Sequence, residues 1–178
     1  MRRVGIALNL LLRAGIVVVL ADALINADEP RYAGKAIGTR GLAIIPFSLA
    51  VPALHLWRRR HDRYPVWTDN LYLSVFALDL GGNMFDLYDR YLYFDLIPHA
   101  HGTGAVTVVL AELIPMPGLS AVGVAQLLHI VLEAQEYYSD VFFGLRNVRG
   151  TWDVVNDLLA GAVGSVAYVA LRSVFRRR

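Results

Sequence analysis

Long apolar runs alternate with short charged clusters along this chain of 178 residues. Six of these runs approach the ~20 residues that an α-helix needs to cross the hydrocarbon core of a bilayer. The pattern therefore predicts an all-α membrane helical bundle of about six transmembrane helices, in a single integral membrane domain that covers residues 1–178. The expected spans are residues 4–26, 36–57, 67–88, 97–115, 119–139 and 152–174.

The composition agrees with a membrane protein. Apolar residues make up 56% of the chain and the mean hydropathy is +0.46, whereas a soluble domain is about half apolar. Pro46 and Pro52 are expected to kink the second span. The chain contains no cysteine, which excludes disulfides, zinc–thiolate sites and iron–sulfur clusters.

The charges indicate how the chain is oriented in the membrane. The net charge is only +2, but arginines gather at residues 2–3, 58–63 and 176–178. This is the spacing of membrane-flanking anchors and not of a nucleic-acid-binding face. We therefore expect membrane lipids as partners, no nucleic acid, and both termini in the cytoplasm. The loops at residues 27–35, 89–96 and 140–151 are expected outside.

The end of the fifth span is unusually polar for a membrane helix. His129, Glu133, Glu136 and Asp140 are spaced four, three and four residues apart, so they share one helical face. Each ionisable group costs several kcal/mol to bring into lipid. A buried stripe of this kind indicates that the face lines a polar cavity inside the bundle.

Other spans bring polar residues to the same depth. In the predicted topology the third and fifth spans end at the outer face, and the fourth and sixth begin there. Asp153 lies four residues before Asp157 and is expected to face the same cavity. The pocket wall is expected to consist of Asp79, Asn83, Asp86, Asp95 and Asn156.

Carboxylates and imidazoles without thiols suit a divalent metal, namely Zn²⁺, Mn²⁺, Fe²⁺ or Mg²⁺. The expected ligands are His99, His129, Glu133 and Asp153, and Glu133, Glu136 and Asp157 are the expected catalytic groups. Such a site at the outer leaflet could activate water against a lipid headgroup bond or another envelope substrate. The sequence has no H-E-x-x-H motif, so the reaction stays open.

Two other functions fit the same residues. Intramembrane acids and histidines also serve proton and cation paths, which would make the chain a small transporter or an ion-binding protein without covalent chemistry. At 178 residues a transporter would be small unless it forms a homo-oligomer. The network could instead only hold the bundle together, although contacts between membrane helices average under about 1 kcal/mol each.

Two more polar positions in the predicted spans carry separate expectations. Glu112 lies near the inner end of the fourth span, apart from the stripe, and Arg13 is its expected partner. His101 comes two residues after His99, so it is expected to point elsewhere on the helix.

The polar segments also resemble a known family. The resemblance to the YjdF-like inner-membrane family, also called DUF2238, rests on three segments: Asp95-Leu-Ile-Pro-His99 with Gly102, Glu133-Ala-Gln-Glu136, and Gly150-Thr-Trp-Asp-Val-Val-Asn-Asp157. The last segment is also distantly similar to VanZ-type membrane proteins. The resemblance implies a multi-pass protein of the bacterial inner membrane and carries no settled activity. The loop at residues 145–149 departs from the family pattern.

Overall fold

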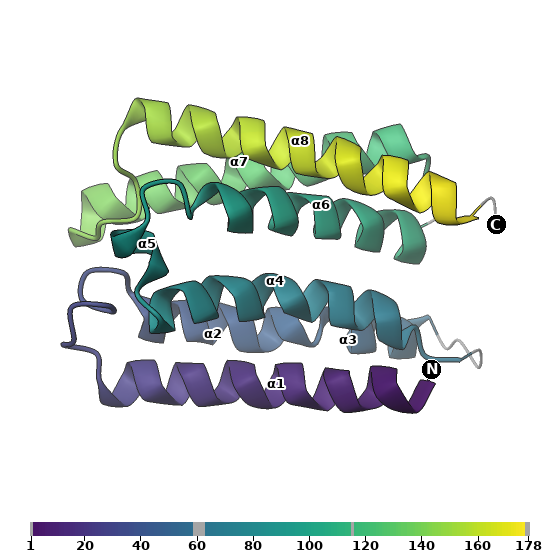
Figure 1. Ribbon diagram of the computed structural model, residues 1–178, viewed down its shortest axis with the longest axis horizontal. Helices are drawn as coiled ribbons and strands as arrows, with labels where there is room; N and C mark the ends of the chain where they lie inside the picture. Colours follow the sequence, from purple (N-terminus) through teal and green to yellow (C-terminus); the bar gives the residue numbers. More distant parts are fainter. Residues whose placement is uncertain (1, 59–62, 115, 177–178) are drawn as a thin grey trace. The chain divides into compact units, whose positions relative to one another are not determined.

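The computed structural model describes residues 2–58, 63–114 and 116–176. These residues form helices joined by turns and loops, and none of them lies in a strand. The helices are α1 (Arg2–Ile25), α2 (Ile37–Ser48), α3 (Ala50–Trp57), α4 (Val66–Met84), α5 (Leu87–Arg90), α6 (Leu96–Leu113), α7 (Gly118–Phe143) and α8 (Thr151–Arg176) (Figure 1). The all-helical prediction is confirmed.

Four of the described helical segments are long and apolar enough to cross a membrane. The first is α1 and the third is α7. The second runs from Arg40 to Trp57 and comprises most of α2 together with α3, and the fourth is Thr151–Val174 of α8. The count of about six is therefore not reached on length and composition alone. Much of the arginine cluster at residues 58–63 lies outside the described residues, as does the end of the C-terminal tail.

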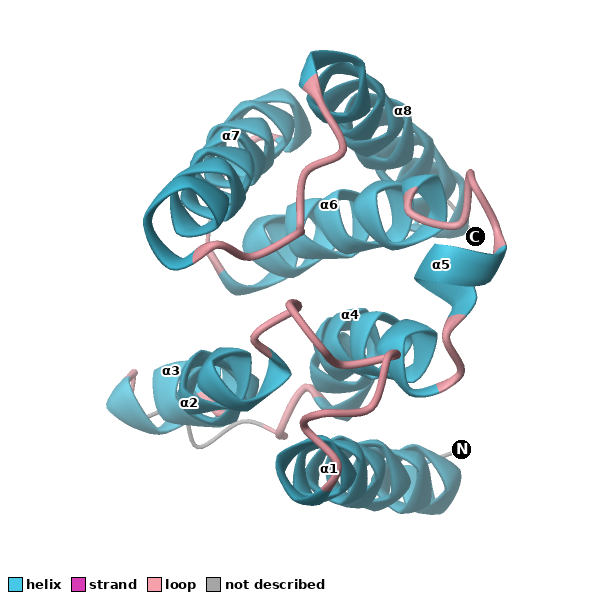
Figure 2. Cartoon of the chain, turned by 90° about the vertical axis from the view of Figure 1, so that its left-hand side faces the viewer, coloured by secondary structure: helices cyan, strands magenta, loops and turns pink. Residues whose placement is uncertain are grey.

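The chain divides into two compact units, an N-terminal unit of residues 1–87 and a C-terminal unit of residues 88–178. In the N-terminal unit α1 packs along α4, and α2 lies beside both (Figure 2). The apolar core of this unit includes Ile16, Leu20, Leu73 and Leu80. These four side chains come from the α1–α4 pair, which therefore organises the unit.

The second predicted span is interrupted at Leu49, between its two prolines. Proline has no N–H, so Pro52 cannot bond to the carbonyl of Ser48 four residues before it. That carbonyl instead accepts a hydrogen bond from Arg13 Nη1 at 3.1 Å. The expected kink thus supplies an acceptor for a charged side chain of α1.

The turn after α1 is held by a small polar group. Tyr32 is buried, and its hydroxyl donates to Asp22 Oδ2 at 2.6 Å. Arg31 lies 3.1 Å from the same oxygen and also donates to the carbonyl of Met84. Burial and the hydrogen bond to Asp22 raise the pKa of Tyr32 to about 12. The neutral phenol therefore persists as a donor over the physiological range.

The C-terminal unit is a three-helix arrangement of α6, α7 and α8, which Figure 2 shows as a triangle seen along the helices. Small residues let α6 and α8 approach closely. A Cβ added at Gly164 would collide with the backbone of Ala100, and one at Gly104 would lie 2.7 Å from the ring of Tyr168. Close approach through glycine is the usual device for packing helices in lipid.

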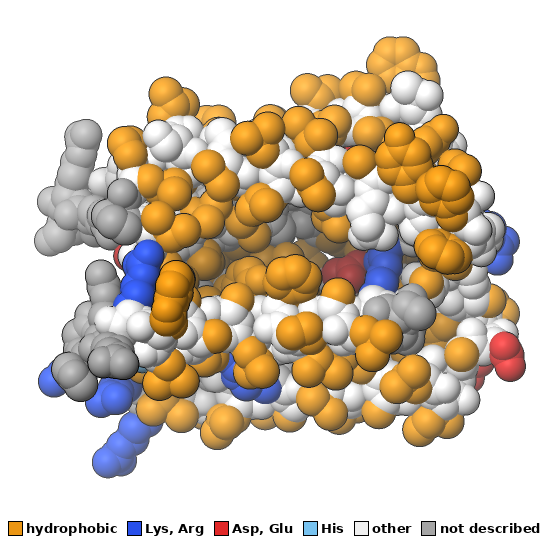
Figure 3. All heavy atoms as spheres, turned by 180° about the vertical axis from the view of Figure 1, so that it is seen from behind, with side chains coloured by type: hydrophobic (Ala, Val, Ile, Leu, Met, Phe, Trp, Pro, Cys, Tyr) orange, Lys and Arg blue, Asp and Glu red, His pale blue; other side chains and the backbone are white. Residues whose placement is uncertain are grey.

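Apolar side chains cover most of the face of the molecule drawn in Figure 3. On α7, Leu127, Val131 and Phe142 are examples of large apolar residues that are more than half exposed. Apolar helix surfaces outside, with glycine and polar side chains at the helix contacts, are typical of membrane proteins.

Two helix ends differ from the expected ones. α4 ends at Met84, and Asp86 beyond it has a φ of 58°. The third expected span, residues 67–88, is therefore shorter as a helix, because a left-handed residue ends the helical face of Asp79 and Asn83. α7 continues to Phe143 and ends at Gly144, whose φ of 66° suits a helix C-terminus. Residues 140–143 are thus helix and not loop.

Candidate metal centre

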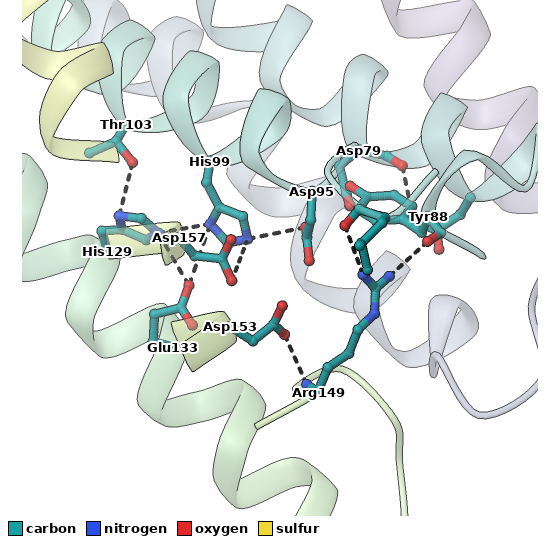
Figure 4. A network of polar contacts seen from close by, with 12 residues as sticks. Asp79, Tyr88, Asp95, His99, Thr103, His129, Glu133, Arg149, Asp153 and Asp157 are labelled. Carbon is teal, nitrogen blue, oxygen red and sulfur yellow. Dashed lines mark hydrogen bonds and ion pairs between the residues drawn. The ribbon is translucent and has the colours of Figure 1, made fainter. Parts of the chain in front are cut away.

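Three donor atoms of the C-terminal unit face one another between α6 and α7 (Figure 4). His99 Nδ1 lies 2.8 Å from His129 Nε2. Glu133 Oε1 is 3.2 Å from the same nitrogen of His129 and 3.4 Å from His99 Nδ1. His129 and Glu133 come from adjacent turns of α7, as their spacing predicted. We call these three residues the His–His–Glu triangle.

The triangle has the size of a set of metal ligands. Bonds of about 2.0–2.1 Å from a metal to nitrogen or oxygen put neighbouring ligand atoms roughly 2.9–3.3 Å apart. The three observed separations, 2.8, 3.2 and 3.4 Å, are close to that range. One point about 2 Å from all three atoms therefore exists beside the triangle.

Each imidazole is also held from its opposite side. His99 Nε2 lies 3.3 Å from Asp95 Oδ1, and His129 Nδ1 lies 3.2 Å from the hydroxyl oxygen of Thr103. Asp95 immediately precedes α6 with helical backbone angles, so at four-residue spacing it lies on the same side as His99 and Thr103 of that helix. A ligating histidine ordinarily donates its second N–H to a carboxylate or another oxygen. Asp95 and Thr103 each place an oxygen where it can accept this N–H.

Gly161 on α8 makes room for the triangle. A Cβ at this position would collide with Nδ1 of His129 and would lie 2.8 Å from the hydroxyl oxygen of Thr103. Any side chain there would displace the imidazole or the threonine that holds it. The close approach of α8 thus fixes the ring of His129 in place.

The centre is well shielded. The side chains of His129, Asp157 and Glu133 are 2%, 4% and 5% exposed, and that of His99 is 11% exposed. Oε1 of Glu133 has no hydrogen-bond partner among the described residues. A buried carboxylate oxygen without a partner costs free energy, so the triangle is suited to an added cation.

Asp157 lies on the other side of the His99 ring. Its Oδ2 is 4.0 Å from His99 Nε2, the nitrogen that also faces Asp95. Its Oδ1 is buried and has no hydrogen-bond partner among the described residues. Figure 4 shows the carboxylates of Asp95 and Asp157 both directed toward this nitrogen.

The structure thus brings together five of the residues that the sequence singled out: Asp95, His99, His129, Glu133 and Asp157. Asp153 lies one turn before Asp157, and its Oδ2 accepts the backbone N–H of Arg149 at 2.8 Å. Glu136 lies almost one turn beyond Glu133 and belongs to neither group of metal-capable side chains. Asn156 is exposed, on a different side of α8 from buried Asp157.

The remaining pocket-wall residues belong to the N-terminal unit. Asn83 donates to the backbone carbonyl of Asp79 at 3.0 Å, and Arg40 lies 3.7 Å from Asp79 Oδ1. Asp86 follows the end of α4. Their expected place in the pocket wall stays a prediction.

Sequence reasoning missed Thr103 and Gly161 and gave Asp95 only a place in the wall. The spacing of Asp95, His99 and Thr103 at four-residue intervals was available as a signal. The role of Gly161 was not, because it depends on which residue of α7 faces α8.

Two expectations away from the centre have clear outcomes. His101 contacts the hydroxyl of Tyr168 at 2.6 Å, so it points away from His99, as expected. The predicted pairing of Glu112 with Arg13 is wrong. Glu112 pairs with Arg172 on α8 at 2.7 Å, and Arg13 pairs with Asp69 on α4 at the same distance.

The loop between α7 and α8 is anchored by Asp140. Its carboxylate accepts hydrogen bonds from the backbone N–H groups of Asn147 and Val148, each at 2.8 Å to Oδ2. The side chain of Arg149 donates to the carbonyl of Tyr88 at 2.7 Å. Asp140, expected to line the polar stripe, therefore orders the loop that leads into α8.

No family model, curated protein or solved structure matches this chain in comparisons with known proteins.

Proposed function

We propose that this chain is a multi-pass membrane protein whose C-terminal unit holds a divalent metal between His99, His129 and Glu133 and acts on a lipid headgroup or another envelope substrate. The single observation that carries the proposal is that each imidazole is contacted through both of its nitrogens. Both imidazoles turn one nitrogen toward Glu133 while an oxygen of Asp95 or Thr103 holds the other.

The chemical types of the three ligands limit which metal ions are expected to bind. Two imidazole nitrogens and one carboxylate favour Zn²⁺, Mn²⁺ or Fe²⁺ over Mg²⁺, which prefers oxygen ligands. Three protein ligands also leave a coordination position for water or substrate, as in catalytic zinc sites. We therefore assign His99, His129 and Glu133 as ligands and give Asp153 a role in ordering the loop.

When bound, such a metal acidifies a coordinated water and polarises a substrate oxygen. Around it, Asp95 and Thr103 keep the proton of each imidazole on the nitrogen that faces away from Glu133. The carboxylate of Glu136 is the group we propose for proton transfer. The proposed reaction is a hydrolysis of a headgroup bond.

We also propose that α4 and α6 cross the membrane, giving six spans with both termini in the cytoplasm of a bacterial cell. At 19 and 18 residues, these helices are about 27–29 Å long, close to the hydrocarbon thickness. Their polar residues are buried against neighbouring helices, for example Asp69 and Asn70 on α4 and Thr107 on α6. Inward-facing polar residues lower the mean hydropathy of a helix without exposing charge to lipid.

The test is the metal content of the full chain purified in detergent. We expect about one equivalent of tightly held Zn²⁺, Mn²⁺ or Fe²⁺ by plasma mass spectrometry, and its loss in His129→Ala combined with Glu133→Ala. The matched control is His101→Ala, a histidine of α6 that contacts Tyr168 instead. Equal metal content in all three proteins, or none in the unaltered chain, would refute the metal site.

The reaction is tested separately. The metal-loaded chain is incubated with mixed phospholipids, and released headgroups are followed by mass spectrometry. Release that the Glu133→Gln variant lacks supports a hydrolase. A chain that binds metal and releases no product points instead to a cation-binding or transport role.

A further inference from the structure

The carboxylates beyond His99 form a second group of potential ligands. His99 Nε2 and the carboxylate oxygens of Asp95 and Asp157 all lie within 4.8 Å of one another. This group is on the opposite side of the ring from the His–His–Glu triangle, which uses Nδ1. The two groups share only His99.

A proton on His99 Nε2 satisfies only one of the two carboxylates. Asp95 Oδ1 is 3.3 Å from Nε2, within reach of a weak hydrogen bond, whereas Asp157 Oδ2 at 4.0 Å is not. Asp157 is 3% exposed, and its Oδ1 has no partner among the described residues. A buried carboxylate in this state is costly unless a cation or a proton joins it.

The cationic side chain of Arg149 is engaged elsewhere. The guanidinium of Arg149 donates to the carbonyls of Tyr88 and Leu92, and the backbone N–H of Arg149 goes to Asp153. Among the described residues, the recorded ion pair of Asp157 is with His99 alone.

A metal in the His–His–Glu triangle would not supply a partner for the carboxylate of Asp157. A neutral imidazole that ligates through Nδ1 carries its proton on Nε2. That proton points toward Asp95, the nearer carboxylate. The first metal therefore strengthens the His99–Asp95 contact and adds no partner for Asp157.

We propose that a second divalent cation binds between Asp95 and Asp157, so that the centre holds two cations, one on each side of the His99 ring. This inference rests on the proposed metal site. The second position offers carboxylate oxygens from the protein, with water or substrate completing the shell. It therefore favours a hard cation, Mn²⁺ or Mg²⁺, whereas the triangle with its two nitrogens favours Zn²⁺, Mn²⁺ or Fe²⁺.

The experiment counts Mn²⁺, which suits both positions. The full chain in detergent is stripped with a chelator, loaded with Mn²⁺, dialysed and measured by plasma mass spectrometry and electron paramagnetic resonance. We expect two Mn²⁺ per chain and a spectrum broadened by the interaction of two neighbouring ions. Asp157→Asn should bind one Mn²⁺, with the six-line spectrum of an isolated ion.

The control is Glu112→Gln, which removes a carboxylate near the other end of α6, where it pairs with Arg172. It should still bind two Mn²⁺. In the metal-free state we expect Asp157→Asn to unfold at the same or a higher temperature than the unaltered chain, because it removes an unpaired buried charge.

The outcomes separate the two proposals. One Mn²⁺ per chain, unchanged by Asp157→Asn, overturns the second cation and leaves the first site standing; a proton on Asp157 then replaces the cation. No bound Mn²⁺ or other metal overturns both. The count on the unaltered chain is decisive even if the Asp157→Asn variant fails to fold.

Discussion

A methyl group at position 161 would occupy space that the imidazole of His129 and the hydroxyl of Thr103 now fill. We therefore expect Gly161→Ala to destabilise the chain by about 1–3 kcal/mol, the usual cost of overpacking, and to weaken metal binding. Thermal unfolding in detergent and metal content measure the two effects.

Gly123 provides the matched control, since a Cβ there meets no atom within 4 Å. Gly123→Ala should leave metal content unchanged and stabilise α7 by up to about 1 kcal/mol through helix propensity. If the two alanine variants behave alike, the tight packing at Gly161 does not constrain His129.

Thr103 tests whether the second nitrogen of His129 matters. Thr103→Val has nearly the same shape but no hydroxyl, so the Nδ1 contact at 3.2 Å is lost. We expect metal affinity to fall about 10–100-fold, the usual effect of removing such an orienting group. Thr103→Ser keeps the hydroxyl and should bind almost as well as the unaltered chain in a competition assay with a metal-sensitive dye. Equal losses in both variants would mean that packing, and not the hydrogen bond, is what Thr103 supplies.

At the scale of helices, the ion pair of Arg13 and Asp69 ties α1 to α4. Asp69 is fully buried, and its Oδ2 accepts hydrogen bonds from Arg13, Asn9 and Tyr64, each at 2.7 Å. Asp69→Asn would leave the guanidinium without its counter-charge. Because the Arg13 side chain is 24% exposed, we expect a loss at the lower end of the roughly 3–5 kcal/mol for breaking a buried pair.

The comparison for this pair is Glu29→Gln. The Glu29–Arg31 pair has the same 2.7 Å separation, but the Glu29 side chain is 48% exposed, so we expect a loss below about 1 kcal/mol. Denaturant unfolding in mild detergent, followed by tryptophan fluorescence, ranks the two variants. Similar small losses would show that water reaches Asp69.

The helix positions were predictable because apolar runs and prolines determine them locally. The six expected spans correspond to α1, α2 with α3, α4, α6, α7 and α8. The spacing of His129 and Glu133 placed both on one face of α7. Partners across helices were not predictable. Arg13 was predicted as the partner of Glu112 because the sequence indicates the depth of a residue in the membrane but not which helices are neighbours. In the structure α6 packs on α8, which brings Arg172 to Glu112.

Mean hydropathy alone also understates how well a helix that buries polar residues is suited to a membrane. α4 carries Asp69, Asn70 and Asn83 on buried surfaces, and α6 carries His99 and His101, which contact side chains of α7 and α8. A windowed average counts these residues as though they faced lipid. Such residues lower the mean hydropathy of α4 and α6, so the number of crossings has to be measured on the loop between these helices.

For the whole molecule, the loop at residues 91–95 distinguishes four crossings from six. With the N-terminus inside, Lys35 lies outside and Arg58 inside in either topology, since both flank the candidate span Arg40–Trp57. Tyr93 differs: it lies outside if α4 and α6 cross and inside if they do not. The chain has no cysteine, so Lys35→Cys, Arg58→Cys and Tyr93→Cys can each be labelled alone in intact cells with a membrane-impermeant maleimide.

We expect labelling of Lys35→Cys and Tyr93→Cys in intact cells, and of Arg58→Cys only after the cells are permeabilised. Tyr93 is 70% exposed, so a lack of labelling there cannot come from burial within its own unit. If Tyr93→Cys behaves like Arg58→Cys, α4 and α6 do not each cross the membrane, and the six-span proposal is wrong. That result would also conflict with the packing of the C-terminal unit, because Arg149 precedes α8, lies outside in either topology, and donates to the carbonyl of Leu92 at 3.4 Å.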